Sequence, residues 1–124
     1  MRFLFALTAL GFTAVPSVLA AVHNVDVGED GFTFSPNTVH AKVGDTVQFH
    51  FYAGDHSVAQ STFKSPCHPH SPKAIFSGFI NPSGGDKEAD EMFAMRVNTT
   101  DPIFLYCAQV GHCEAGMVMV INPT

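Results

Sequence analysis

The sequence predicts an all-β fold, a β-sandwich, and three observations support this prediction. Short stretches alternate apolar and polar residues, and in the clearest of them Val47, Phe49 and Phe51 share one face of a strand at 46–52. Clusters of turn-forming residues, such as the one at 28–31, separate these stretches. No stretch has a helical period of useful length. Many short strands without helices between them indicate two packed sheets.

The first half of the predicted sandwich contains four strands. Residues 22–27 alternate apolar and polar side chains as a half-buried strand does, and the turn cluster at 28–31 ends them. Residues 32–34 alternate again until Pro36 interrupts the pattern. A short strand is expected at 38–41, after which the chain turns into the strand at 46–52.

The second half begins with a long connection at 65–90, which shows little alternation. Four prolines fall within it, at positions 66, 69, 72 and 82. Connections of this length are uncommon unless they are functional, and we expect a loop with one turn of helix near 72–76. Strands at 92–97, 103–106 and 117–121 then complete the sandwich.

Residues 1–20 have the pattern of a secretory signal peptide. Arg2 supplies a positive start, an apolar run covers 3–15, and Val18 and Ala20 suit cleavage after Ala20. The run is too short to span a bilayer. An N-terminal core helix is the less favoured alternative. The sequence therefore predicts a single mature domain, 21–124, that begins at Ala21.

Composition narrows the possible partners and the compartment. The formal net charge of −5 argues against nucleic-acid binding, which needs a basic face. We expect a monomer with neither a transmembrane segment nor a C-terminal lipid anchor. Secretion would place the chain outside the cell, in an oxidising environment where disulfides form. There Asn98, which begins an Asn-Thr-Thr sequon, is a glycosylation candidate.

One stretch near the C-terminus, residues 106–117, concentrates metal-binding side chains. Its pattern C-x4-H-C-x3-M offers a thiolate from Cys107, an imidazole from His112 and a thioether from Met117. One further imidazole would complete a copper site of two His and one Cys with a weak axial Met. Zinc is the main rival, and it would need a fourth strong ligand such as Cys113. Alternatively, Met117 is an ordinary core residue.

These residues also carry a family resemblance. The pairs Tyr106-Cys107, His112-Cys113 and Gly116-Met117, the stretch at 55–63 and the triplet at 77–79 resemble the cupredoxins and, within them, the plant phytocyanins. The likeness is closer still to small secreted cupredoxin-like proteins of fungi. It implies a Greek-key β-sandwich of seven or eight strands.

The resemblance implies which histidine joins the loop. The cupredoxin pattern places its first His at His56, which follows the strongest predicted strand; otherwise His56 is a polar turn residue. We expect His50 to face solvent from the polar side of its strand. His23 and His40 are expected at the surface, and His68 and His70 offer at most a second, weaker metal site.

An odd number of cysteines in a secreted chain leaves one unpaired. The sequence has three, and copper ligation by Cys107 would account for the odd one. Cys67 and Cys113 would then form a disulfide, as the resemblance also implies. This pairing makes zinc ligation by Cys113 the less favoured alternative.

The predicted function is that of a mononuclear blue (type 1) copper protein that carries single electrons as Cu(I) and Cu(II) alternate. We expect no enzyme, because full coordination leaves no open position for a substrate. The electron would pass to or from an unknown redox partner protein through the edge of His112, beside Val110 and Gly111. Two alternatives remain: a non-redox copper-binding or cell-wall module of the same fold, and a copper-dependent oxidative enzyme with His23 as its N-terminal residue.

Overall fold

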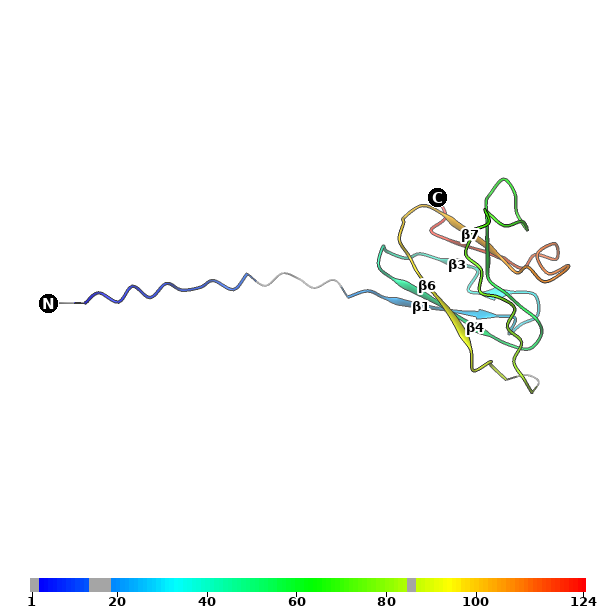
Figure 1. Ribbon diagram of the computed structural model, residues 1–124, viewed down its shortest axis with the longest axis horizontal. Helices are drawn as coiled ribbons and strands as arrows, with labels where there is room; N and C mark the ends of the chain where they lie inside the picture. Colours follow the sequence, from blue (N-terminus) through cyan, green and yellow to red (C-terminus); the bar gives the residue numbers. More distant parts are fainter. Residues whose placement is uncertain (1–2, 14–18, 85–86) are drawn as a thin grey trace.

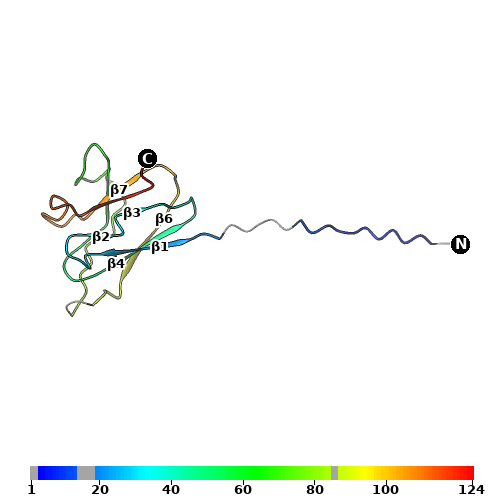
Figure 2. The ribbon, with the colours of Figure 1, turned by 180° about the vertical axis from the view of Figure 1, so that it is seen from behind.

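The computed structural model describes residues 3–13, 19–84 and 87–124, and Figures 1 and 2 show it from opposite sides. Eight strands form two four-stranded sheets, and there is no helix within the described ranges. Residues 3–13 are all exposed and add nothing to the core, so this part of the chain does not form the alternative core helix. Predictions on residues 14–18, including Val18 of the cleavage pattern, lie outside the described residues.

The first sheet has the strand order β2-β1-β4-β6. Its central strands, β1 (Val22–Val27) and β4 (Thr46–Phe51), run parallel along their full lengths, from Val22↔Thr46 to Val27↔Phe51. The edge strands β2 (Phe34–Ser35) and β6 (Met92–Arg96) pair antiparallel with them. This register places the end of β4 and the turn after β1 at the same end of the sheet.

The second sheet has the order β3-β8-β7-β5. Its short edge strands are β3 (Thr38–Val39) and β5 (Ala59–Ser61), and its central strands β7 (Ile103–Tyr106) and β8 (Val118–Ile121) are antiparallel. Because Tyr106 pairs with Val118, the residue after β7 and the residue before β8 lie side by side. These residues are Cys107 and Met117.

The predicted fold class is confirmed, with corrections to individual elements. Strands expected at 32–34 and 38–41 are shorter or shifted. β5 was not predicted, since three residues with polar Gln60 and Ser61 give no clear alternation. The helical turn expected near 72–76 is only a single turn at 71–74, where the Ala74 N–H donates to Ser71 O at 3.0 Å. Residues 75–77 instead run beside β5, where the Gln60 N–H donates to Ile75 O and the Ser77 N–H donates to Val58 O. Backbone groups committed to a neighbouring strand are not available for a helix.

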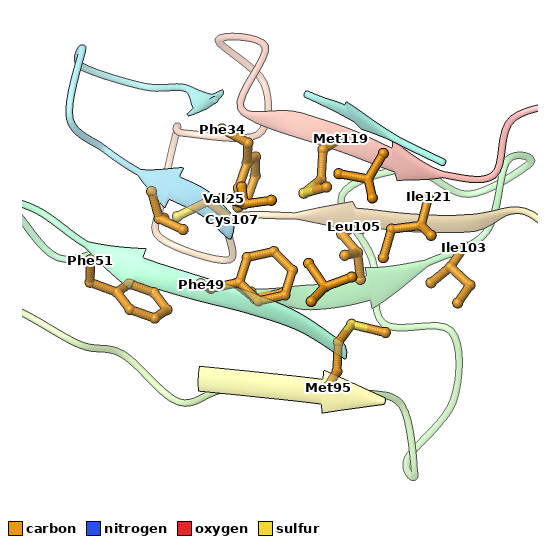
Figure 3. Packing of buried hydrophobic residues seen from close by; sticks show 14 of the residues in the cluster. Val25, Phe34, Phe49, Phe51, Met95, Ile103, Leu105, Cys107, Met119 and Ile121 are labelled. Atoms are coloured by element: carbon orange, nitrogen blue, oxygen red, sulfur yellow. The ribbon is translucent and has the colours of Figure 1, made fainter. Parts of the chain in front are cut away.

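The core fills the space between the sheets, and Figure 3 shows its inward-pointing side chains. Alternate residues of β1 and β4 face those of β7 and β8, as the period of two predicts. Val47, Phe49 and Phe51 are completely buried, as the sequence predicted. Cys107 and Met117 belong to the same buried cluster. The candidate metal ligands are thus continuous with the hydrophobic core.

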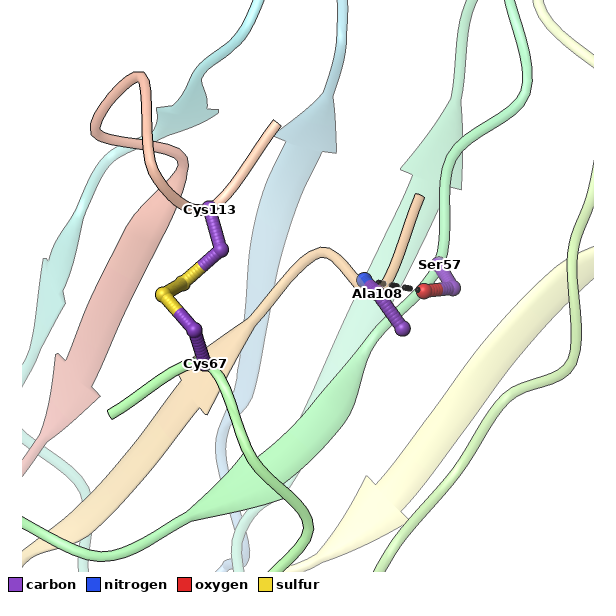
Figure 4. Close-up of a disulfide and its surroundings, with 4 residues drawn as sticks. All are labelled: Ser57, Cys67, Ala108 and Cys113. Carbon is purple, nitrogen blue, oxygen red and sulfur yellow. Dashed lines mark hydrogen bonds between the residues drawn. A yellow bond between two sulfur atoms is a disulfide. The ribbon is translucent and has the colours of Figure 1, made fainter. Parts of the chain in front are cut away.

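The disulfide Cys67–Cys113 is present and Cys107 is free, as predicted (Figure 4). It joins the long 65–90 connection to the loop between β7 and β8. It also removes Cys113 from any set of metal ligands, which excludes the zinc alternative that relied on this thiolate. The connection is therefore attached at two places, by the disulfide and by its backbone bonds along β5.

We expect the double variant Cys67→Ser/Cys113→Ser to lower the free energy of unfolding by about 4 kcal/mol, because the cross-link spans a separation of 46 residues. Urea denaturation of the metal-free protein measures this loss. Reduction of the unmodified disulfide is the matched control and should give the same shift. An unchanged urea midpoint in both cases would show that the disulfide does not stabilise the fold.

Candidate metal centre

The structure brings three predicted donors to one end of the sandwich. The ligating atoms of His56, Cys107 and His112 all lie within 4.8 Å of one another. His56 comes from the segment between β4 and β5, whereas Cys107 and His112 come from the loop between β7 and β8. Within the described ranges these residues form a compact three-donor group in which His56 is distant in sequence from the other two.

His56 is held in a single orientation and tautomer. Its side chain is 2% exposed, and Nε2 lies 3.1 Å from Ala53 O. Because a carbonyl oxygen only accepts, Nε2 carries the proton, and the lone pair of the neutral ring is on Nδ1. Nδ1 is the atom that faces Cys107, at 4.0 Å from Sγ. Burial lowers the pKa of His56 despite the opposing hydrogen bond to Ala53, and this favours the neutral ring that metal binding requires.

Two glycines make room for the His56 ring. A Cβ on Gly28 would lie 2.2 Å from His56 Nε2, and one on Gly54 would lie 3.1 Å from the same atom. Gly28 also has a φ of 78°, a conformation that other residues rarely adopt. The turn after β1, which the sequence indicated only as a turn, therefore forms one wall of the metal centre.

Cys107 is fully buried, and its sulfur accepts a hydrogen bond from the Ser57 backbone N–H at 3.4 Å. The Ser57 hydroxyl in turn accepts a hydrogen bond from Ala108 N–H at 2.8 Å (Figure 4). Ser57 thus connects the segment that carries His56 to the loop that carries Cys107. Sequence reasoning assigned no role to this serine, because its only signal was its position next to His56.

A second serine holds the same segment from its other side. The Ser77 hydroxyl accepts a hydrogen bond from Val58 N–H at 2.8 Å and donates one to Gly78 O at 2.7 Å. His56 also forms an isolated antiparallel bridge with Ile80. The triplet at 77–79, noted from the sequence for its family resemblance, therefore positions the His56 segment.

His112 lies closest to the surface among the three donors. Its side chain is only partly buried, and its Nδ1 is 3.5 Å from Cys107 Sγ. The ring of Phe32 stacks on the His112 ring, with centroids 4.0 Å apart and planes inclined by 26°. Phe32 was predicted only as a strand residue, and no sequence pattern indicated that it would contact the distant loop that carries His112. It is itself half exposed, so the stack forms part of the surface.

Met117 is placed beside Cys107 by the loop backbone. Its N–H donates to His112 O at 3.0 Å, and its carbonyl accepts from Cys107 N–H at 3.2 Å. Its side chain is completely buried in the cluster that contains Cys107. The loop therefore closes on itself and brings the thiol, the imidazole and the thioether to one end of the core.

The remaining histidines lie elsewhere. His50 is half-buried on the polar side of β4, where its ring bonds to Glu88 and Asn24. His23 bonds to Asp45. His40, His68 and His70 are exposed and belong to no group of three donors within the described ranges.

The donor set suits a single copper ion. Two imidazoles and a thiolate accept copper in either common oxidation state, and a thioether is a weak, soft additional donor. Structural zinc sites use four strong ligands. Met117 is not a strong zinc ligand, and the sulfur of Cys113 is in the disulfide.

Comparison with known proteins agrees with this geometry. The chain is 41% identical over 108 residues to a probable GPI-anchored cupredoxin-1 of Arthroderma benhamiae, a match that covers 85% of the chain. The solved structure of auracyanin B superposes with a TM-score of 0.60 over 89% of this chain and 93% of that one, at 15% identity. The chain belongs to the cupredoxin superfamily. The resemblance predicted from the 106–117 loop is confirmed.

This cupredoxin has a second fungal relative. It is 35% identical over 106 residues to an extracellular serine-rich protein of Arthroderma benhamiae, a match that covers 84% of the chain. The matches cover 54% and 41% of the two relatives, so the chain spans about half the length of the curated relatives it matches. No protein-family model matches the chain.

We expect Gly28→Ala to weaken metal binding by about 10- to 100-fold, because the new Cβ would displace a ring that is enclosed and supports a ligand position. Gly31→Ala is the matched control: Gly31 also has a positive φ, of 84°, but nothing lies within 4 Å of the position that its Cβ would take. Competition titration with a copper chelator measures both affinities. Equal affinities would show that the clash with His56 has no effect on the centre.

Proposed function

We propose that this cupredoxin binds one copper ion through His56, Cys107, His112 and Met117 and carries single electrons to a partner protein. The observation that supports this most is the buried Cys107 sulfur facing the Nδ1 atoms of two histidines. Copper bound there would supply the one-electron couple between Cu(I) and Cu(II). The protein itself would set the positions of the ligands and their exposure to solvent.

Contacts within the protein hold the candidate ligands in position. His56 is fixed by Ala53 and by the two glycines, and Cys107 is fixed by Ser57. The loop that carries Cys107 is closed by its own backbone bonds and attached through the disulfide. Ligands that are fixed before the metal binds need little reorganisation when its charge changes, which favours rapid electron exchange.

The exposure of the ligands favours a carrier over an enzyme. His56, Cys107 and Met117 are at most 2% exposed, so no substrate reaches them from solvent. His112 is the ligand whose ring approaches the surface, stacked on half-exposed Phe32 and close in sequence to Val110, which is 91% exposed. An apolar surface around one ligand edge allows close approach of a partner protein without access by a small substrate.

The alternative of a copper-dependent oxidative enzyme would need a second metal site at His23. His23 lies at the start of β1, whereas His56 follows the far end of β4, the parallel neighbour of β1. The His23 Nε2 is bonded to the Asp45 carboxylate at 2.9 Å. These positions favour the electron carrier, and they leave a non-redox copper-binding module as the second candidate.

For localisation, we propose secretion after removal of residues 1–20. The relatives are named as GPI-anchored and as extracellular, which supports a position at the cell surface or outside the cell. No helix in the described ranges is long and apolar enough to cross a membrane. Asn98 is exposed after β6, at the end of the sandwich opposite His56, where a glycan would leave the metal centre uncovered.

Cys107→Ser should abolish the intense visible absorption of the copper-loaded protein, because that absorption requires a copper–thiolate bond. His56→Ala should lower copper affinity and open a coordination position. His50→Ala is the matched control, since His50 lies on the polar face of β4 and contacts Glu88 and Asn24. Visible spectroscopy and copper titration test all three variants, and identical behaviour of the two histidine variants would exclude His56 as a ligand.

Met117→Gln should lower the reduction potential, because the harder amide oxygen favours Cu(II) over Cu(I). Met119→Gln is the matched control, as Met119 is also buried but pairs with Leu105 further along the sheet. Each substitution should cost about 1–3 kcal/mol of stability, because a polar amide enters the core. Voltammetry measures the potentials. A blue, copper-loaded Met117→Gln protein with an unchanged potential would show that Met117 only packs.

A further inference from the structure

A buried carboxylate, Asp45, lies at the end of the sandwich opposite the metal centre. Asp45 is 5% exposed and directly precedes β4, whose six residues span roughly 20 Å before the chain reaches His56. Its carboxylate accepts hydrogen bonds from the Ala21 backbone N–H, the Lys42 backbone N–H and His23 Nε2, each at 2.9 Å. The proposed metal centre uses none of these groups.

The Asp45 backbone is fixed as firmly as its side chain. Its N–H donates to Lys42 O at 3.0 Å, and its carbonyl accepts from Val97 N–H at 2.8 Å. The hydrogen bond from His23, followed by those from the Lys42 and Ala21 backbones, lowers the pKa of Asp45 to about 2. The carboxylate is therefore charged at any pH at which the protein is expected to work.

Ala21 is where the chain joins the sandwich. Residues 19 and 20 are exposed and outside any strand, whereas the Ala21 carbonyl accepts a hydrogen bond from Thr46 N–H at 3.0 Å. Ala20 and Ala21 are both exposed, so the peptide bond between them lies at the surface. The first residue attached to the fold is thus also the first residue after the predicted cleavage point.

We propose that Asp45 is the binding site for the α-ammonium group that forms at Ala21 when the leader is removed. Hydrolysis of the Ala20–Ala21 bond consumes one water, gives the carboxylate to Ala20 and gives the amine, which takes up the proton, to Ala21. The nitrogen that now donates one amide N–H to Asp45 Oδ1 would become an ammonium with three N–H donors and a positive charge. Charge-assisted hydrogen bonds are stronger than neutral ones, so processing strengthens a contact that already exists.

This inference rests on the proposed secretion but not on the proposed copper chemistry. If the proposal is right, the mature chain is more stable than the precursor. The added stability comes from the ion pair between Ala21 and Asp45, which forms only when cleavage occurs directly before Ala21. A start one residue earlier would move the charge away from Asp45, and a start two residues later, at His23, would remove the Ala21 nitrogen altogether.

The test compares two forms of residues 21–124, which contain both sheets and the disulfide. One form has a free amine at Ala21. The other is N-acetylated, which preserves the amide N–H and removes only the charge. We expect the free-amine form to melt about 3–5 °C higher at pH 6 in low salt. The difference should disappear in Asp45→Asn, whose amide lacks the charge. An equal difference in both backgrounds, or none in the unsubstituted chain, would overturn the proposal.

A second measurement does not depend on the folding of the Asp45 variant. NMR titration of the free-amine form should show an α-amine pKa above its ordinary range of about 7.7–8.0, because the carboxylate favours the ammonium. An ordinary value would overturn the ion pair. Mass measurement of secreted protein locates the natural start, and a start other than Ala21 would also overturn it. Copper titration of the same samples tests the proposed function separately. A failure of the proposed copper binding can therefore be distinguished from a failure of the proposed ion pair at Asp45.

Discussion

The Cys107 sulfur belongs both to the hydrophobic core and to the candidate metal centre. It lies in the cluster that joins the two sheets and is also the atom around which His56 and His112 converge. A thiolate in an apolar core is costly unless charge and hydrogen bonds compensate it. The Ser57 N–H supplies one such bond. A copper ion bound at this position would supply the compensating charge and would thereby couple metal binding to core stability.

The segments that carry the ligands are irregular, yet each is fixed by bonds to its neighbours. Ser57 attaches the His56 segment to Ala108, and Ser77 attaches it to the connection after β5. The Cys67–Cys113 disulfide attaches that connection to the loop carrying His112. Rigidity at this end of the sandwich therefore comes from side-chain to backbone contacts and one cross-link, where the strands themselves have ended.

The two ends of the sandwich differ in their chemistry. At one end, two imidazoles and a thiol lie close together, and one of the rings, His112, reaches the surface beside Phe32. At the other, the charged carboxylate of Asp45 holds the start of β1 to the turn before β4. The parallel pairing of β1 with β4 separates these ends by a full strand length.

The sequence by itself determined the features that depend on short-range pattern. Alternation in 46–52 predicted the core face of β4, and the spacing within 106–117 predicted which donors share a loop, because both are set by residues close together in the chain. Only the tertiary structure decided what depends on long-range contact. Gly28 fits against His56, Phe32 stacks on His112, and residues 75–77 pair with β5. These contacts join residues whose separation in sequence carries no periodic signal, since they meet only once the chain has folded.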